Sequence, residues 1–159
     1  MSFFFRNSDP AALQQATSTL IHRPGPYVTG LREVIDELTG LTVIALPMTM
    51  VREIVPARAM MTAAYVLAGP GRIYCGESTR IGRRIWDHAG DASKSFAREA
   101  FVITRSGTES LDMGAAIYLQ AHLTRRAEEA GFVTVQRGTG PQVLEATPAR
   151  GAFYARVAT

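Results

Sequence analysis

A Gly-Pro-Gly break between two short β-rich runs is the feature that most constrains how this chain can fold. The first run is Ala-Ala-Tyr-Val-Leu at residues 63–67, and the second is Arg-Ile-Tyr-Cys-Gly at residues 72–76. Two such runs around a Gly/Pro turn predict a β-hairpin. We expect a four-residue loop at residues 68–71. In that register Tyr65 lies directly opposite Tyr74, on one face of the hairpin.

The length and composition predict one compact domain with its own core. The chain has 159 residues, of which 47% are hydrophobic and 19% charged. We divide it into a helical and strand segment packed on the core (residues 1–62), a central domain (63–137) and an irregular tail (138–159). No apolar run approaches the ~20 residues that a membrane-spanning helix needs, so we expect no membrane association.

The sequence predicts an α+β fold, with a small antiparallel sheet of about three central strands flanked by helices and an extra N-terminal helical segment. Helices are predicted at residues 9–21, 29–38, 79–88 and 110–130, one or two helical turns at 48–54, and further strands at 41–46, 100–104 and 132–135. In the last helix, apolar residues recur every four positions and form one stripe. The stripe comprises Leu111, Ala115, Leu119, Leu123 and Ala127. Ser110 is the expected N-cap of this helix and Gly131 its C-cap.

The cysteine count indicates the cellular compartment, and the charge distribution indicates the class of partner. Cys75 is the only cysteine, which excludes an internal disulfide and a cysteine metal cluster and favours the cytoplasm. The net charge is +3, and residues 63–127 hold the whole excess, with nine basic against six acidic residues. Positive charge confined to one segment suits an anionic partner, although chance can also produce it. The candidate nucleic-acid-binding residues are Arg80, Arg83, Lys94 and Arg98.

The two tyrosines and the basic helix that follows them predict phosphodiester chemistry. Arg80, Arg84 and His88 recur every four residues, so they share one face of the helix. Cleavage of a phosphodiester needs a base, positive charge on the developing phosphorane and a proton for the leaving oxygen. The plainer alternatives are a cross-strand packing pair and a solvated helix face. The combined spacing of all these residues favours a site.

The order hairpin, helix, strand, long helix resembles the GIY-YIG nuclease domain, particularly its small stand-alone bacterial members. The second signature triplet is present as Tyr-Cys-Gly, whereas the first matches only in its tyrosine. The matching positions are Tyr65, Tyr74, Cys75, Gly76, Arg84 and His88. The resemblance covers roughly residues 63–137.

This resemblance implies a metal-dependent endonuclease that hydrolyses DNA. It assigns the base to Tyr65 or Tyr74, whose phenol would be acidified by nearby cations. Arg84 would clamp the phosphate, and His88 would assist proton transfer. The implied partner is duplex or branched DNA, bound weakly and in a salt-dependent way.

The position of the family's metal-binding glutamate is occupied here by Gln120. The resemblance implies one Mg²⁺ or Mn²⁺, and an amide offers such an ion only a neutral carbonyl. Glu77 is a second candidate ligand. The glutamine is either native or an introduced, inactivating substitution. Two other functions therefore stay open, a non-catalytic nucleic-acid-binding module on the same fold and a protein-interaction domain.

Overall fold

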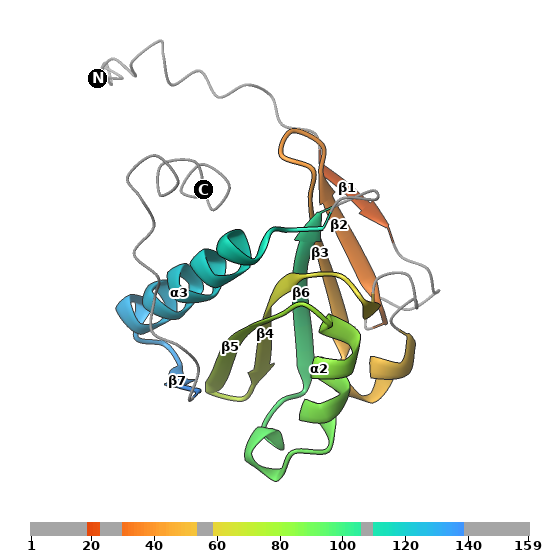
Figure 1. Cartoon of the computed structure of the whole chain (residues 1–159). Coiled ribbons are helices and arrows are strands. Elements are labelled where there is room, and N and C mark those ends of the chain that lie inside the picture. The colour runs from red at the N-terminus through yellow and green to blue at the C-terminus, as the bar shows by residue number, and fades with distance from the viewer. Residues whose placement is uncertain (1–18, 23–29, 54–58, 106–109, 139–159) are drawn as a thin grey trace, which may run out of the picture.

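The computed structural model describes residues 19–22, 30–53, 59–105 and 110–138. In this part of the chain, one seven-stranded sheet is covered by two α-helices (Figure 1). The strands are β1 Thr19–His22, β2 Arg32–Asp36, β3 Leu41–Pro47, β4 Ala63–Gly69, β5 Arg72–Ser78, β6 Glu99–Arg105 and β7 Thr134–Gln136. The helices are α2 Ile81–Ala89 and α3 Met113–Ala130, with short 3₁₀ helices η2 Met48–Glu53 and η3 Ala92–Lys94. The predicted α+β class is confirmed, but the sheet is larger than the three strands expected.

The strand order is β1-β2-β3-β6-β4-β5-β7. Neighbouring strands are antiparallel except β5 and β7, which are parallel. The two edges of the sheet therefore come from the N-terminal strands and from the segment that follows α3. None of the helices in the described ranges is long and apolar enough to cross a bilayer.

The predicted N-terminal helices are wrong where the structure describes them. The helix expected at residues 29–38 is replaced by β2, and the end of the helix expected at residues 9–21 is replaced by β1. The start of that helix lies outside the described residues. The β-branched pair Val34 and Ile35 suits a strand. The deciding interaction is non-local, because β2 pairs with both β1 and β3.

The remaining predicted elements are confirmed, with small changes at their ends. Strands β3 and β6, helix α2 and the short strand β7 lie within two residues of their expected bounds, and α3 begins three residues later than expected. Asp112, rather than Ser110, caps α3, because its Oδ1 accepts a hydrogen bond from the Ala115 amide at 2.8 Å. Gly131 ends this helix in the left-handed conformation, with φ of 68°.

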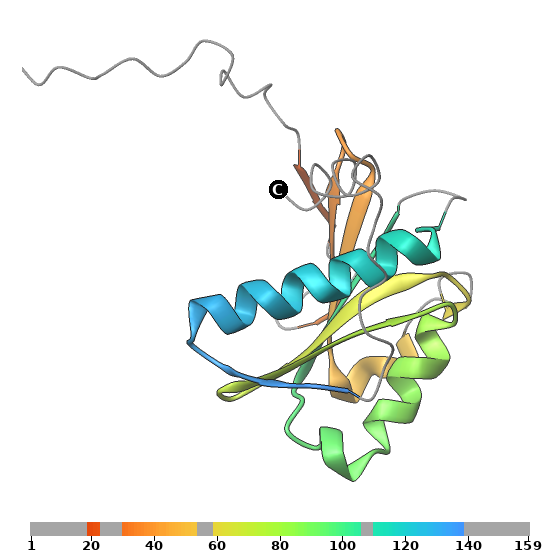
Figure 2. The same ribbon diagram turned by 60° about the vertical axis from the view of Figure 1, so that its left-hand side comes forward.

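The two helices lie on opposite faces of the sheet (Figure 2). Apolar residues of α2 pack with Tyr65, Leu67 and Tyr74 in the larger core cluster. Residues of α3 pack with Ala64, which neighbours Tyr65 on β4 and points to the other face. We refer to these two sides as the α2 face and the α3 face.

The hairpin forms as predicted, but its register differs from the prediction. Only Pro70 and Gly71 form the loop, because Gly69 still pairs with Arg72. Proline presets its own φ, and Gly71 adopts a φ of 66°, so two residues suffice to reverse the chain.

The observed register places Tyr65 opposite Gly76, and Tyr74 opposite Leu67. A shift of two residues preserves the face, so both tyrosines still point to the α2 face, as diagonal neighbours with ring centroids 6.1 Å apart. Gly76 leaves the space that the Tyr65 ring fills. A Cβ at Gly76 would lie 2.4 Å from both Cζ and Oη of Tyr65.

We expect Gly76→Ala to lower the free energy of unfolding by about 1–3 kcal/mol, the usual effect of overpacking a core. The clash would push the Tyr65 phenol away from its present position. Gly90→Ala is the matched control, since the nearest atom to its Cβ would be 3.7 Å away. Denaturant unfolding measures both variants, and equal stability of the two would contradict this account of Gly76.

Candidate active site

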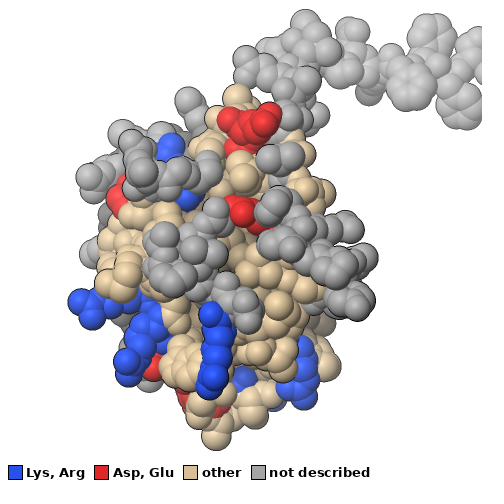
Figure 3. Space-filling model, turned by 90° about the vertical axis from the view of Figure 1, so that its right-hand side faces the viewer, with Lys and Arg blue, Asp and Glu red and all other residues tan. Residues whose placement is uncertain are grey.

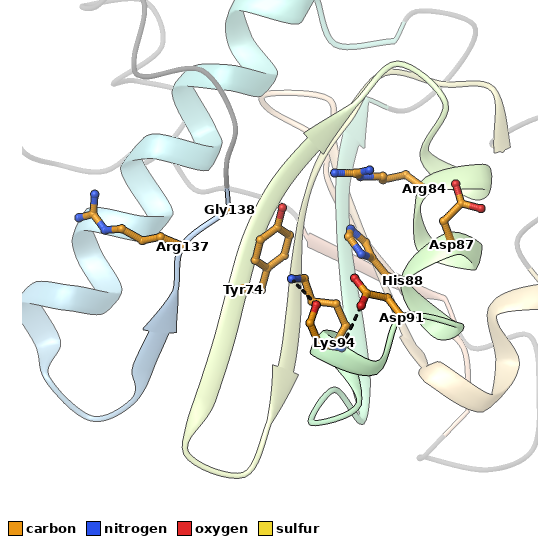
Figure 4. A pocket seen from close by; sticks show the side chains of 9 residues that line it. Tyr74, Arg84, Asp87, His88, Asp91, Lys94, Arg137 and Gly138 are labelled. Carbon is orange, nitrogen blue, oxygen red and sulfur yellow. Dashed lines mark hydrogen bonds between the residues drawn. The ribbon is translucent and has the colours of Figure 1, made fainter.

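Four of the residues singled out in the sequence come together on the α2 face. Tyr65 and Tyr74 project from the hairpin, and Arg84 and His88 project toward them from α2. Figure 4 shows Tyr74, Arg84 and His88. The His88 ring centroid lies 5.5 Å from that of Tyr65 and 5.4 Å from that of Tyr74. Arg84 and His88 are four residues apart, so both side chains lie on the same face of α2.

A directed pair of hydrogen bonds joins three of these side chains. Arg84 Nε donates to the Tyr65 hydroxyl oxygen at 3.3 Å. The Tyr65 hydroxyl is then free to donate its proton to His88 Nε2, 2.7 Å away. Burial lowers the pKa of His88 and favours its neutral form, so we assign the acceptor role to Nε2 and the ring proton to Nδ1.

The protonation equilibria agree with this arrangement. Burial lowers the pKa of His88 to about 4, helped by the positive charges of Arg84 and Lys94. Burial and the nearby Tyr74 raise the pKa of Tyr65 far above its ordinary value. The expected acidification thus does not occur at Tyr65, which stays protonated and fully enclosed.

A pocket of about 360 Å³ opens beside Tyr74. It is lined by Tyr74, Arg84, Asp87, His88, Asp91, Ser93, Lys94, Arg137 and Gly138. Tyr65 does not line it, so Tyr74 is the tyrosine that a bound molecule would meet. Gly138 passes close to the Tyr74 hydroxyl, because a Cβ at that position would lie 2.9 Å from the oxygen.

The part of the pocket that β7 and the residues after it contribute was not predicted from the sequence. Arg137 and Gly138 reach Tyr74 because β7 runs parallel to β5, a pairing that no local pattern indicates. Arg137 forms a bidentate ion pair with Glu128 of α3, with Nη2 2.6 Å and 2.8 Å from the two carboxylate oxygens.

The predicted nucleic-acid-binding residues divide into two groups. Arg80, Arg83 and Arg98 are exposed. Lys and Arg side chains gather in the lower half of the face seen in Figure 3, at the height of α2. Arg83 pairs with Asp87 on the same helix at 2.8 Å. Lys94 differs from the three arginines, because it is only 8% exposed and lies against Tyr74 inside the pocket.

The proposed metal ligands lie apart from this pocket. Gln120 of α3 uses its amide nitrogen to donate to the Cys75 carbonyl oxygen at 3.4 Å. Glu77 pairs with Ala64 and so belongs to the α3 face, away from the tyrosines. In the described ranges, no group of three His, Cys, Asp or Glu side chains could hold a metal ion. These residues do not provide the carboxylate set that Mg²⁺ or Mn²⁺ prefers.

No protein-family model, no curated protein and no solved structure matches the chain.

The state of His88 predicts a pH-dependent stability. The folded protein takes up the His88 proton only near pH 4, whereas the unfolded chain takes it up near pH 6.5. Between pH 4 and pH 6.5 the His88 side chain binds more protons in the unfolded state than in the folded state. The free energy of unfolding should therefore fall as the pH is lowered from 6.5 toward 4.

Denaturant unfolding between pH 5 and 7 tests this. His88→Gln should lose that part of the pH dependence, since its amide oxygen can still accept from Tyr65 but does not titrate. His122→Gln, on α3, should keep the wild-type dependence. Parallel stability curves for the wild type and His88→Gln would show that His88 is not held neutral.

Proposed function

We propose that the chain is an endonuclease of the GIY-YIG type that hydrolyses DNA phosphodiester bonds in the pocket beside Tyr74. The observation that carries the proposal is the uncharged His88, held by Tyr65, next to a pocket with several cations. Arg84, Lys94 and the Nδ1–H of His88 are donors that suit phosphate oxygens. The resemblance to the nuclease domain adds the reaction class.

The proposed reaction gives each of these side chains one task. A water oxygen bonds to phosphorus and its proton passes to Tyr74 in its deprotonated form, while the bond to the leaving sugar oxygen breaks and that oxygen takes up a proton through His88. We assign the contact with that water to Tyr74, because Tyr65 is enclosed and remains protonated. Arg84 stabilises the charge on the phosphoryl oxygens. Tyr65 acts indirectly, by fixing the tautomer and orientation of His88.

A binding module without catalysis is the second candidate, and Gln120 favours it. In the family pattern this position supplies a carboxylate, whereas here an amide donates to the Cys75 carbonyl. No catalytic step is assigned to a metal ion, because the described residues do not fit one. A nicking assay on supercoiled DNA with Mg²⁺ and with Mn²⁺ separates the two candidates.

In any form of the chain that cleaves, we expect Arg84→Ala to lower the rate by roughly 10²-fold or more, the usual loss for a preorganised charge. Tyr65→Phe and Tyr74→Phe should keep the fold and also lower the rate. Arg126→Ala is the control, because Arg126 is exposed on α3 and outside the pocket. Single-turnover cleavage measures the rate, and unchanged rates in all three site variants would refute the assignment.

We expect the chain as given to bind Mg²⁺ poorly and to cleave slowly or not at all, and the family resemblance implies that Gln120→Glu raises both. The substitution places a carboxylate against the Cys75 carbonyl, and two facing oxygens attract a cation. A Mg²⁺-dependent rise in Tm and faster nicking are the two readouts. Gln120→Ala, which removes the bond without adding a carboxylate, should show neither.

A glutamate variant that is as inert as the wild type across a range of Mg²⁺ and Mn²⁺ would overturn the nuclease proposal. Binding of DNA by that variant would leave the binding module as the remaining candidate.

A further inference from the structure

Lys94 is a buried cation inside the pocket. It is 8% exposed, and its ammonium lies 4.2 Å from the centroid of the Tyr74 ring (Figure 4). The position of Lys94 is fixed by the turn η3. Asp91 accepts from the Ser93 amide at 2.8 Å through its side chain and from the Lys94 amide at 2.9 Å through its carbonyl.

The neighbours of the Lys94 ammonium leave its charge without a carboxylate partner among the described residues. It donates to Ser93 Oγ at 3.3 Å, and with the Gln136 amide assigned in its hydrogen-bonding orientation it also donates to that amide oxygen at 3.1 Å. Both acceptors are neutral, and an ammonium has three N–H groups to satisfy. Asp91 is close enough for its pKa to be lowered in part by Lys94, but its side-chain oxygen bonds to the Ser93 amide.

A buried charge is costly unless an opposite charge or hydrogen bonds compensate it. The Lys94 ammonium can donate a further hydrogen bond, and it lies in a pocket that Arg84 and Tyr74 also line. An oxyanion in the pocket would supply both the missing charge and the missing acceptor.

We propose that Lys94 is the anion anchor of the pocket and binds a phosphoryl oxygen directly beside the Tyr74 ring. The ligand chemistry is a phosphate oxyanion, either in a DNA phosphodiester or in free phosphate. The choice of a phosphodiester rests on the proposed function, whereas the anion site itself does not. The three exposed arginines named above would then serve the flanking phosphates.

Lys94 is the only lysine in the chain, which makes a direct chemical test available. An amine-specific reagent can modify only Lys94 and the α-amino group, and the α-amino group serves as an internal reference. Mass spectrometry of the peptides gives the two modification rates in the free protein, with a short DNA oligonucleotide and with inorganic phosphate. We expect the oligonucleotide to slow modification of Lys94 relative to the reference.

Affinity measurements provide a second arm that does not depend on access of the reagent to Lys94. Lys94→Gln should weaken binding of the same oligonucleotide about tenfold or more, the scale of losing a charge-assisted hydrogen bond. Lys94→Arg should retain more of the affinity. Arg126→Gln makes the same change in net charge outside the pocket and should change the affinity by less than about twofold.

The outcomes separate this inference from the proposed function. Protection by phosphate but not by DNA supports the anion site and counts against the phosphodiester. If the protein does not cleave DNA but the oligonucleotide or phosphate still protects Lys94, the anion site is supported although the proposed function is not. The anion site would be overturned if Lys94→Gln and Arg126→Gln lost equal affinity. It would also be overturned if the reagent modified Lys94 and neither the oligonucleotide nor phosphate slowed that modification.

Discussion

The hydrogen bond between Tyr65 and His88 ties the central hairpin to α2, and the rest of the site depends on it. The bond is possible because Gly76 leaves space for the phenol on the opposite strand. It holds the His88 ring in place, and burial lowers the pKa of that imidazole and so favours its uncharged form at neutral pH. The glycine of the Tyr-Cys-Gly triplet thus has a physical role, since any side chain there would displace Tyr65.

The site could be predicted from sequence to the extent that its residues lie in local patterns. Side chains alternate between the two faces of a sheet along each strand, which puts Tyr65 and Tyr74 on the same face of the hairpin. Arg84 and His88 are four residues apart and share one helix face, so the sequence predicts that these four side chains lie together. The register was not predictable in the same way, because a Gly-Pro-Gly run allows both a two-residue and a four-residue loop. Even so, the two registers differ by two residues and place the tyrosines on the same face.

Non-local pairing explains the parts that the sequence did not indicate. Residues 29–38 read as a helix in isolation, but β2 forms because β1 and β3 flank it. Lys94 was predicted as one of four nucleic-acid-binding residues, and only the packing of its ammonium against Tyr74 shows that it is buried. Arg137 reaches the pocket through the parallel pairing of β5 and β7, which joins segments about sixty residues apart.

The central claim is that this pocket and the basic surface around it bind the phosphates of a nucleic acid. The affinity for a labelled DNA duplex, measured over a range of salt concentrations, tests it most directly. Contact with three or four phosphates should give a slope of about −3 to −4 for the logarithm of the binding constant against that of salt. Arg80→Ala and Arg83→Ala should each flatten the slope by about one unit. No detectable binding at low salt to duplex, branched or single-stranded DNA, or to RNA, would contradict the account and favour a protein-interaction domain.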